Sequence, residues 1–303
     1  MNELDQKGVL CVGRVYCDLV FAGLPHMPKL GEEVYAESFS AHAGGGAYIT
    51  AAYLAAAEQP TDLCAFLPHG PIGTFVQNDL NKSGISKTYT EEADASWGTQ
   101  LTVAMALNDD RAFLTRRGGA PIPDSFDRAI NDPTIQHLHI AELATLLEAP
   151  TILERAKQAG LTISLDCAWD ESAMDAGHVR ELIGEVDLFL PNLSEFRRVF
   201  DVAGEIEFFT SEMSNWATKV IVKRGADGAT LFHKAYHISA PALHCAIVDP
   251  TGAGDAFNAG FITAWLRGKS DQEALAEGNR FAASSISSIG GATGAAMIKK
   301  TGS

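Results

Sequence analysis

Cysteine is sparse in this chain, and none of the cysteines forms part of a Cys-x-x-Cys pair. There are five, an odd number: Cys11, Cys17, Cys64, Cys167 and Cys245. This pattern argues against a disulfide framework and against a zinc site. The nine histidines also lack the spacing of metal ligands. Scattered thiols are typical of proteins in a reducing compartment, so we expect a cytoplasmic location.

Long apolar segments and an excess of positive charge are also missing. No apolar run approaches the length of a membrane span, and the first residues lack the apolar stretch of a signal peptide. The chain has 23 basic and 38 acidic residues, which gives a net charge of −15. We therefore expect neither nucleic acid nor an anionic membrane as a partner. The apolar fraction of 46% over 303 residues is enough for a sizeable core.

The most informative stretch is a glycine loop at residues 249–257, Asp-Pro-Thr-Gly-Ala-Gly-Asp-Ala-Phe. Apolar residues follow at helical spacing as far as Trp265, and Gly268 marks the end of the predicted helix. Gly252 and Gly254 allow backbone N–H groups to converge, and the first turn of a helix adds unpaired N–H donors. The stretch therefore predicts an anion-binding site.

Asp255 in this loop has two interpretations. As a helix N-cap it would stabilise the protein by about 0.5–2 kcal/mol without any chemistry. A carboxylate beside converging N–H donors is also what phosphoryl transfer requires, because the donors bind the transferred group and the carboxylate deprotonates the attacking hydroxyl. A helix N-terminus stabilises the carboxylate form, which predicts a weak base. In a loose transition state, however, position matters more than basicity.

The stretch resembles the C-terminal signature of the ribokinase-like (PfkB) family of sugar and nucleoside kinases. The resemblance implies a three-layer α/β/α fold with a doubly wound, mostly parallel central sheet and a small lid of β-strands. It also implies transfer of the γ-phosphoryl group of Mg-ATP to a hydroxymethyl group of a ribose-, fructose- or ketodeoxygluconate-like carbohydrate. Asp255 corresponds to the family's catalytic base, and the backbone of Gly252, Ala253, Gly254 and Asp255 corresponds to its anion hole. A Gly-x-x-x-x-Gly-Lys-Ser/Thr loop is absent from the sequence, which disfavours a Walker-type kinase.

Apolar and amphipathic segments alternate along the chain. Apolar runs at 9–13, 135–140, 161–165 and 186–190 predict strands, and residues 146–158 and the region around Val179 predict helices. This alternation predicts a parallel, doubly wound sheet. Extended runs at 99–107 and 111–118, joined by Asn108, Asp109 and Asp110, predict a hairpin. The resemblance implies one domain over residues 1–303, with a lid built from about 14–42 and 98–118.

Polar and glycine residues near the predicted strand ends are candidates for acceptor binding. They are Asp18, Gly44, Gly45, Gly46, Glu142 and Asp166. The resemblance assigns sugar contacts to most of them, and ligands generally bind at the carboxyl ends of parallel strands. Structurally, the acidic residues would be turn or surface residues, and the glycines a closely packed helix start. His42, beside the glycines, is a candidate neighbour of the substrate.

Two positions depart from the family's pattern. Ile49 stands where members usually carry a sugar-binding Asn, and Tyr16 stands where ribokinases tend to carry an Asn. A site built for hydroxyls loses affinity and selectivity when its polar partners become apolar, which argues against ribose itself. A nucleoside (adenosine-like) kinase and a non-catalytic nucleotide- or sugar-binding protein are the alternatives. A hydroxymethylpyrimidine- or pyridoxal-type kinase is disfavoured by the lid-like segments.

Two further motifs indicate ATP and magnesium. Lys223 followed by Gly225 and Gly228 resembles the family's nucleotide loop, although a turn between two strands explains the same glycines. Asn192 and Glu195 match the family's Asn-x-x-Glu motif for Mg²⁺, which we expect to act through water. The same spacing is that of a helix capping box, and both interpretations are compatible.

The resemblance implies two more properties. Asp249, Thr251 and Gly291 correspond to a monovalent-cation site of mostly backbone oxygens, so K⁺ is a candidate activator. Lid strands with an exposed apolar face often pair across a dimer, so we expect a homodimer. Arg116 and Arg117 are interpreted as an exposed basic pair on a strand edge rather than as phosphate contacts.

Overall fold

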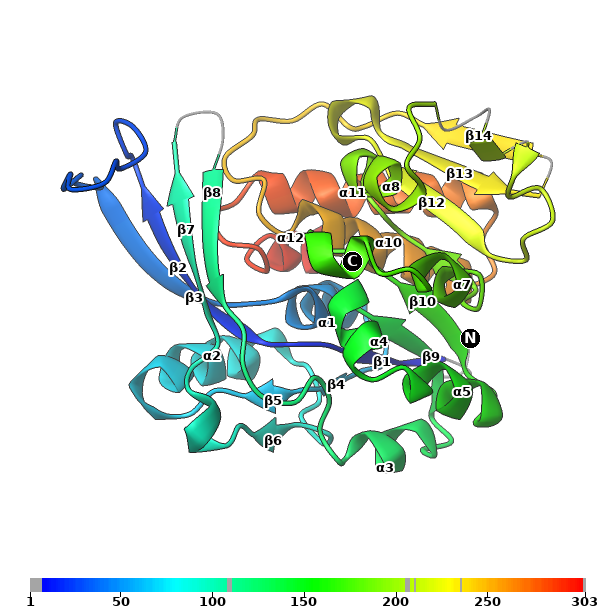
Figure 1. The fold of residues 1–303 in the computed structure, drawn as a ribbon, viewed down its shortest axis with the longest axis horizontal. Coiled ribbons are helices and arrows are strands. Elements are labelled where there is room, and N and C mark those ends of the chain that lie inside the picture. Colours follow the sequence, from blue (N-terminus) through cyan, green and yellow to red (C-terminus); the bar gives the residue numbers. More distant parts are fainter. Residues whose placement is uncertain (1–6, 108–110, 205–207, 210, 235, 302–303) are drawn as a thin grey trace.

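The computed structural model describes residues 7–107, 111–204, 208–209, 211–234 and 236–301. The predicted turn at Asn108, Asp109 and Asp110 lies outside these residues. Helices pack on both sides of a large central sheet, and a second, smaller sheet projects from one end of this body (Figure 1). The predicted three-layer architecture with a β-strand lid is confirmed.

The central sheet has eight strands in the order β14-β13-β12-β11-β10-β9-β1-β4. They are β1 (Gly8–Val12), β4 (Thr61–Cys64), β9 (Ile135–Ile140), β10 (Thr162–Leu165), β11 (Leu188–Phe189), β12 (Lys219–Lys223), β13 (Ala229–His233) and β14 (Tyr236–Ala240). The strands from β4 to β12 pair in parallel, and β13 and β14 add an antiparallel edge. β4 lies on one side of β1 and β9 on the other, so the chain changes direction across the sheet at β1. Ligands bind beside such a reversal, at the carboxyl ends of the strands.

Helices cover both faces of this sheet. One face carries α1 (Gly46–Ala56), α2 (Gly70–Ser83), α10 (Ala253–Leu266), α11 (Asp271–Ile286) and α12 (Ala295–Thr301), and the other carries α3 (Phe126–Ile130), α4 (Leu143–Glu148), α5 (Thr151–Gln158), α6 (Glu171–Met174), α7 (Val179–Ile183) and α8 (Leu193–Phe200). Side chains of β1 alternate between the two cores, since Val9 and Cys11 face the first and Leu10 and Val12 the second. None of the helices in the described residues has both the length and the apolar character that a membrane crossing requires.

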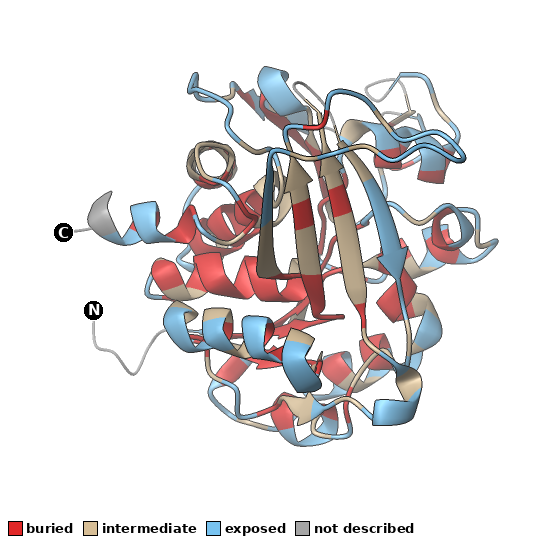
Figure 2. Ribbon diagram, turned by 90° about the vertical axis from the view of Figure 1, so that its left-hand side faces the viewer, coloured by how far each residue is buried: buried red, intermediate tan, exposed pale blue. Residues whose placement is uncertain are grey.

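The lid is a four-stranded sheet in the order β3-β2-β7-β8. Its strands are β2 (Tyr16–Ala22), β3 (Ser38–Gly44), β7 (Leu101–Ala106) and β8 (Arg111–Arg116). A separate two-stranded sheet joins β5 (Phe66–Leu67) to β6 (Glu91–Glu92). The lid strands are mostly intermediate or exposed, whereas α1 beside them is largely buried and α2 exposes most of its outer face (Figure 2). The lid thus combines β2 and β3 with β7 and β8, strands from two distant parts of the sequence, in one sheet.

One predicted helix, at residues 146–158, is wrong in its extent. The structure divides this segment into α4 and α5, with a break at Ala149 and Pro150. Proline has no N–H to continue a helix and forces the preceding residue out of the helical region. Ala149 accordingly has φ −132° and ψ 64°.

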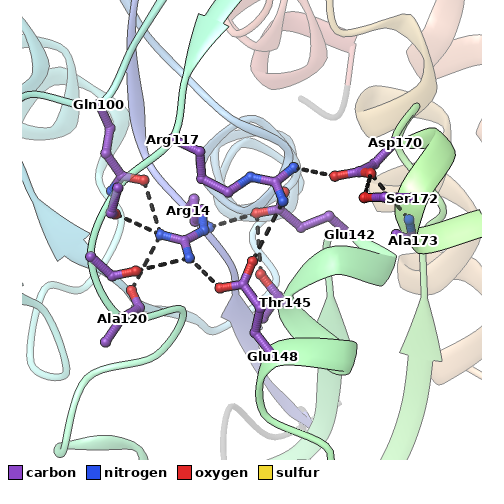
Figure 3. A network of polar contacts seen from close by, with 12 residues as sticks. Arg14, Gln100, Arg117, Ala120, Glu142, Thr145, Glu148, Asp170, Ser172 and Ala173 are labelled. Carbon is purple, nitrogen blue, oxygen red and sulfur yellow. Dashed lines mark hydrogen bonds and ion pairs between the residues drawn. The ribbon is translucent and has the colours of Figure 1, made fainter. Parts of the chain in front are cut away.

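Arg14 joins the central sheet to the segment that leaves the lid (Figure 3). It follows β1 and is only 3% exposed. Its guanidinium donates to the carbonyl oxygens of Gly118 (2.8 Å) and Gly119 (3.0 Å), and it pairs with Glu148 at the end of α4. Its backbone N–H donates to Glu142 Oε1 at 3.0 Å. The guanidinium also donates to Gln100 Oε1 at 3.1 Å, so one buried side chain holds three separate segments at the base of the lid.

We predict that Arg14→Met lowers the free energy of unfolding by about 2–4 kcal/mol, because several buried acceptors lose their donor. Chemical denaturation followed by circular dichroism measures this change. The matched control is Arg198→Met, since Arg198 forms an exposed ion pair with Asp175 at 2.6 Å. An exposed pair contributes at most about 1 kcal/mol. Equal losses in the two variants would contradict the role of Arg14.

Candidate active site

A cavity of about 600 Å³ lies where the carboxyl ends of the central strands face the lid. Most of the predicted site residues line it. These are Asp18, Gly45, Gly46, Glu142, Asp166, Asn192, Glu195, Lys223, Gly225, Gly228, Thr251, Gly252, Ala253, Gly254 and Asp255. Three others, Gly44, Asp249 and Gly291, lie in the wall behind the lining residues. The fold thus gathers motifs separated by more than two hundred residues.

Helix α10 begins inside this cavity. Its N-cap is Gly252, which has φ 75°, and a Cβ there would lie 2.6 Å from the carbonyl oxygen of Gly291. Only glycine adopts this positive φ without strain and has no Cβ to collide with Gly291. Asp255 stands three residues into the helix, so the interpretation of Asp255 as the N-cap is wrong. The unpaired N–H groups of the first turn of α10 lie at the cavity wall and favour an anion.

The glycines at 44–46 bring the start of α1 against two carboxylates. A Cβ on Gly44 would overlap the Asp18 carboxylate, and a Cβ on Gly46 would lie 2.9 Å from Asp255 Oδ1. Gly45 has φ 95° and packs on the carbonyl of Arg14. Gly44 is buried behind Asp18, so it does not itself border the cavity. These glycines serve close packing around Asp18 and Asp255.

Burial raises the pKa of Asp255 to about 7, and the neighbouring carboxylates of Asp166, Glu195 and Asp18 act in the same direction. Lys223 opposes this rise. The helix N-terminus alone predicts a lower pKa, but burial and like charges outweigh it here. Burial also raises the pKa of Asp18 to about 7, with a contribution from Asp249. A carboxylate with a pKa near neutrality is suited to accept a proton from a hydroxyl group.

Lys223 and Asp166 form a buried ion pair at the base of the cavity. Lys223 Nζ lies 3.0 Å from Asp166 Oδ1 and 3.2 Å from Asn258 Oδ1, and Asn258 donates to Asp166 Oδ2 at 2.6 Å. Burial acts to lower the pKa of Lys223, yet Asp166 and Glu195 outweigh it and raise that pKa. Both carboxylate oxygens of Asp166 are therefore hydrogen-bonded to protein groups, whereas we expected Asp166 to contact the sugar directly.

Asn192 and Glu195 form a complete capping box at the start of α8. Glu195 N–H donates to Asn192 Oδ1 at 2.9 Å, and Glu195 Oε2 accepts from the Asn192 N–H at 2.7 Å. Burial raises the pKa of Glu195 to about 7, and the charge of Asp166 adds to this rise. Both residues also border the cavity, so the capping role leaves them available to a ligand.

The glycines of the predicted nucleotide loop differ in their surroundings. A short 3₁₀ turn at Gly225–Asp227 connects β12 to β13. Gly228 has φ 83°, and a Cβ there would collide with the backbone of Ala240 in β14. Gly225 has φ 58° and open space at its Cβ position. The backbone at Gly225 is thus accessible from the cavity, whereas Gly228 is required by packing within the sheet.

The residues expected to hold a monovalent cation lie together beside the start of α10. Asp249 Oδ1 accepts from the Thr251 N–H (2.9 Å) and hydroxyl (2.6 Å), and Asp249 Oδ2 accepts from the Gly290 N–H at 2.9 Å. The carbonyl oxygens of Thr251 and Gly291 converge on the Ser285 hydroxyl, at 3.1 and 3.4 Å. Backbone oxygens of the type that binds K⁺ are therefore gathered at this point.

One expectation needs correction. His42 lines a separate cavity of about 290 Å³ beside α1, α2 and α12, where it contacts Ser40 and Asp79, so it does not border the site described above. Arg117 does face that site, and its guanidinium pairs with Asp170 (2.6 Å) and Glu148 (3.4 Å), as Figure 3 shows. Arg116 instead donates to backbone carbonyls of Thr99 and Trp97. Both arginines are exposed at the end of the edge strand β8, as expected, and they have different partners.

Several cavity residues were not singled out from the sequence. Arg111, Phe113 and Thr115 line the cavity from one face of β8, a pattern that the period of two along a strand could have indicated. Asn258 is fully buried and supports the cavity residue Lys223 from behind; its place three residues after Asp255 on α10 is also a readable signal. Trp169 is 58% exposed at the cavity and follows Ala168, whose φ is 51°. No sequence pattern marks that backbone conformation.

Comparison with known proteins agrees with this geometry. Residues 6–297 match the model of the "pfkB family carbohydrate kinase". The chain is 28% identical over 277 residues to an ATP-dependent ribose-1-phosphate kinase of Halopiger xanaduensis, covering 89% of each protein. It is 30% identical over 253 residues to a 1-phosphofructokinase of Haloferax volcanii, covering 78% of this chain and 77% of that protein.

Solved structures show the same fold. A putative ribokinase II from E. coli, in complex with ATP and Mg²⁺, superimposes with a TM-score of 0.81 at 18% identity, over 98% of each chain. The family match covers nearly all of the described chain, and the elements that form the cavity lie within it. The chain therefore belongs to the pfkB family of carbohydrate kinases, which makes it an ATP-dependent sugar kinase with an alcohol group as acceptor.

Proposed function

We propose that Asp255 is the catalytic base and that the backbone N–H groups of residues 252–255 bind the transferred phosphoryl group. The observation that carries this proposal is the position of Asp255 at the start of α10. Its carboxylate lies beside Gly46 on the acceptor side, and the helix N-terminus lies beside it on the phosphate side. In-line transfer needs the base and the anion-binding groups on either side of the reacting oxygen. A pKa of about 7 allows Asp255 to accept the hydroxyl proton near neutral pH.

ATP and Mg²⁺ are typical of the family, and four residues support a proposal for where they bind. Lys223, the accessible backbone at Gly225, and the acidic and amide groups of Glu195 and Asn192 all border the cavity. Mg²⁺ keeps several of its waters, so Asn192 and Glu195 would hold it through water. Mg²⁺ neutralises charge on the transferred phosphate. Lys223 is held in place by Asp166, which keeps a positive charge at the base of an otherwise acidic cavity.

The acceptor is proposed to be a carbohydrate with a free hydroxymethyl group. Asp18 and Glu142 border the cavity on the acceptor side and are the proposed ligands of its other hydroxyls. Ile49 is 4% exposed and packs against Gly291, and Tyr16 is 7% exposed, so neither position offers the amide of a ribokinase. Ribose is therefore not the favoured acceptor. The two curated relatives described above are named for phosphorylated substrates, so sugar phosphates are included among the candidates.

We also propose K⁺ activation, a homodimer and a cytoplasmic location. The carbonyls of Thr251 and Gly291, together with Asp249, support K⁺ as an activator. Exposed apolar side chains on the lid, Phe39 and Leu114, support a homodimer formed through the lid strands. The cytoplasmic location is supported by the cysteines, because all five carry free thiols.

The acceptor is identified by ADP release from Mg-ATP in the presence of ribose, fructose, 2-keto-3-deoxygluconate, their phosphates and nucleosides. We expect one acceptor to raise the rate by about tenfold or more over the rate without acceptor, and KCl to raise it further than choline chloride does. A nucleoside as the best acceptor would replace the carbohydrate proposal. Tight binding of a sugar without any phosphorylated product would favour a binding protein instead.

Replacement of the proposed base is the direct test of its role. Asp255→Asn should lower kcat by about 10²–10⁴-fold, while the fold and the binding of Mg-ATP persist. Asp175→Asn is the matched control, because Asp175 lies in an exposed ion pair with Arg198. Turnover of Asp255→Asn close to that of the control would remove Asp255 from the mechanism.

The raised pKa predicts how the rate depends on pH. A base must be deprotonated to act, so kcat/KM should rise by about tenfold between pH 6 and pH 8 if its pKa is about 7. Glu195→Gln removes a neighbouring negative charge and should move the midpoint to lower pH. Asp18→Asn should retain a rise in this range, although Asp18 itself has a raised pKa. A flat profile in the wild type would contradict proton transfer to Asp255.

A further inference from the structure

An arginine of the lid, Arg111, contacts the loop that precedes α10. Arg111 is the first residue of β8, and its side chain is 21% exposed. Its Nη1 lies 3.5 Å from Asp249 Oδ1, and its guanidinium lies over the ring of Phe113 at 5.2 Å from the centroid. Both Arg111 and Phe113 line the catalytic cavity. The aromatic ring restricts the orientation of the guanidinium and so favours the contact with Asp249.

Asp249 in turn determines the backbone that precedes the anion-binding turn. It accepts from the N–H and the hydroxyl of Thr251, and from the N–H of Gly290. Thr251 is also held from the other side, since its carbonyl accepts from Ser285. Gly252, the next residue, packs directly on Gly291. A shift of the Asp249 carboxylate would therefore be transmitted to both chain segments that shape the start of α10.

The contact between Arg111 and Asp249 also changes the charge beside the anion-binding turn. Asp249 lies near Asp18 and contributes to the raised pKa of that residue. Without a cation beside it, the charge of Asp249 would repel the phosphates bound at the adjacent helix start. Burial acts to raise the pKa of Asp249, but the hydrogen bonds of Thr251 and Gly290 and the charge of Arg111 outweigh it. The lid thus supplies a positive charge to the segment on which anion binding depends.

We propose that Arg111 is a positioning residue for phosphoryl transfer: from the lid it holds Asp249, and through Asp249 the backbone at Thr251 and Gly252, in the arrangement that binds the transferred group. This proposal rests on the proposed function of residues 252–255 as the anion hole. It makes the lid part of the catalytic arrangement, in addition to any contact that the lid makes with the acceptor. Phosphoryl transfer then depends on the lid even where the lid does not contact the reacting groups themselves.

The first test needs no turnover. Hydrogen–deuterium exchange of the peptide over residues 249–256 is compared in the wild type, in Arg111→Gln and in Arg198→Gln. The Thr251 N–H donates to Asp249, so Arg111→Gln should exchange this segment about threefold faster or more. Arg198→Gln removes a comparable arginine–aspartate pair far from the cavity and should leave the segment unchanged. Equal exchange in all three proteins would overturn the proposal.

The second test separates positioning from direct contact with ATP. With the best acceptor, Arg111→Gln should lower kcat by about tenfold or more while the KM for Mg-ATP changes by less than about twofold. Arg111→Lys should recover part of the loss. In a double-mutant cycle, Arg111→Gln should have little further effect in the Asp249→Asn background. Additive effects, or a loss confined to the KM for Mg-ATP, would overturn the proposal.

The two tests also separate this proposal from the function on which it rests. If the wild type phosphorylates no acceptor, the proposed function fails and the exchange experiment still decides whether Arg111 orders residues 249–256. If the wild type turns over and Arg111→Gln matches it in both tests, the proposed function stands and the role of Arg111 fails.

Discussion

The active-site region depends on two close contacts between segments, and at each contact only a glycine fits because a Cβ atom would collide with its neighbour. Gly252 meets the backbone of Gly291 at the start of α10, and Gly46 meets the carboxylate of Asp255. Together they bring the N-termini of α1 and α10 against one another, and the Thr50 hydroxyl donates to the Asp255 carbonyl at 3.3 Å. Two helix N-termini at one point create a positive potential in a protein with a net charge of −15. This is how an acidic protein offers a site for a polyphosphate.

The second constraint is the burial of carboxylates at that same point. Burial and the charge of Asp166 raise the pKa of both Asp255 and Glu195, and Lys223 is the cation beside these carboxylates. The ion pair with Asp166 keeps Lys223 charged despite its burial. Asn258 completes the arrangement by bonding to both partners. The ion pair of Asp166 with Lys223 offsets part of the cost of burying these charges, and the pKa values of Glu195 and Asp255 are raised to near neutrality.

The lid is joined to this body by charged side chains as well as by chain connections. Arg14 fixes the segment that leaves β8, and Arg117 pairs with Asp170 and Glu148 on the opposite wall. Arg111 reaches the loop before α10. These contacts cross from the partly exposed lid sheet to the carboxyl-end edge of the central sheet, where the acceptor is proposed to bind. At the proposed acceptor site, side chains of both sheets line the cavity.

The sequence by itself determined the class of fold and the motifs, because both depend on local patterns. Alternating apolar segments predicted the parallel sheet, and the glycine loop with Asp255 predicted the anion site and the family. The break at Pro150 is also a local effect of the sequence, which the predicted helix at 146–158 overlooked. The sequence did not reveal the place of His42 in a separate cavity or the pairing of Asp166 with Lys223. Those features, and the reach of Arg111 to Asp249, were decided only by tertiary structure, since they depend on contacts between segments up to 138 residues apart.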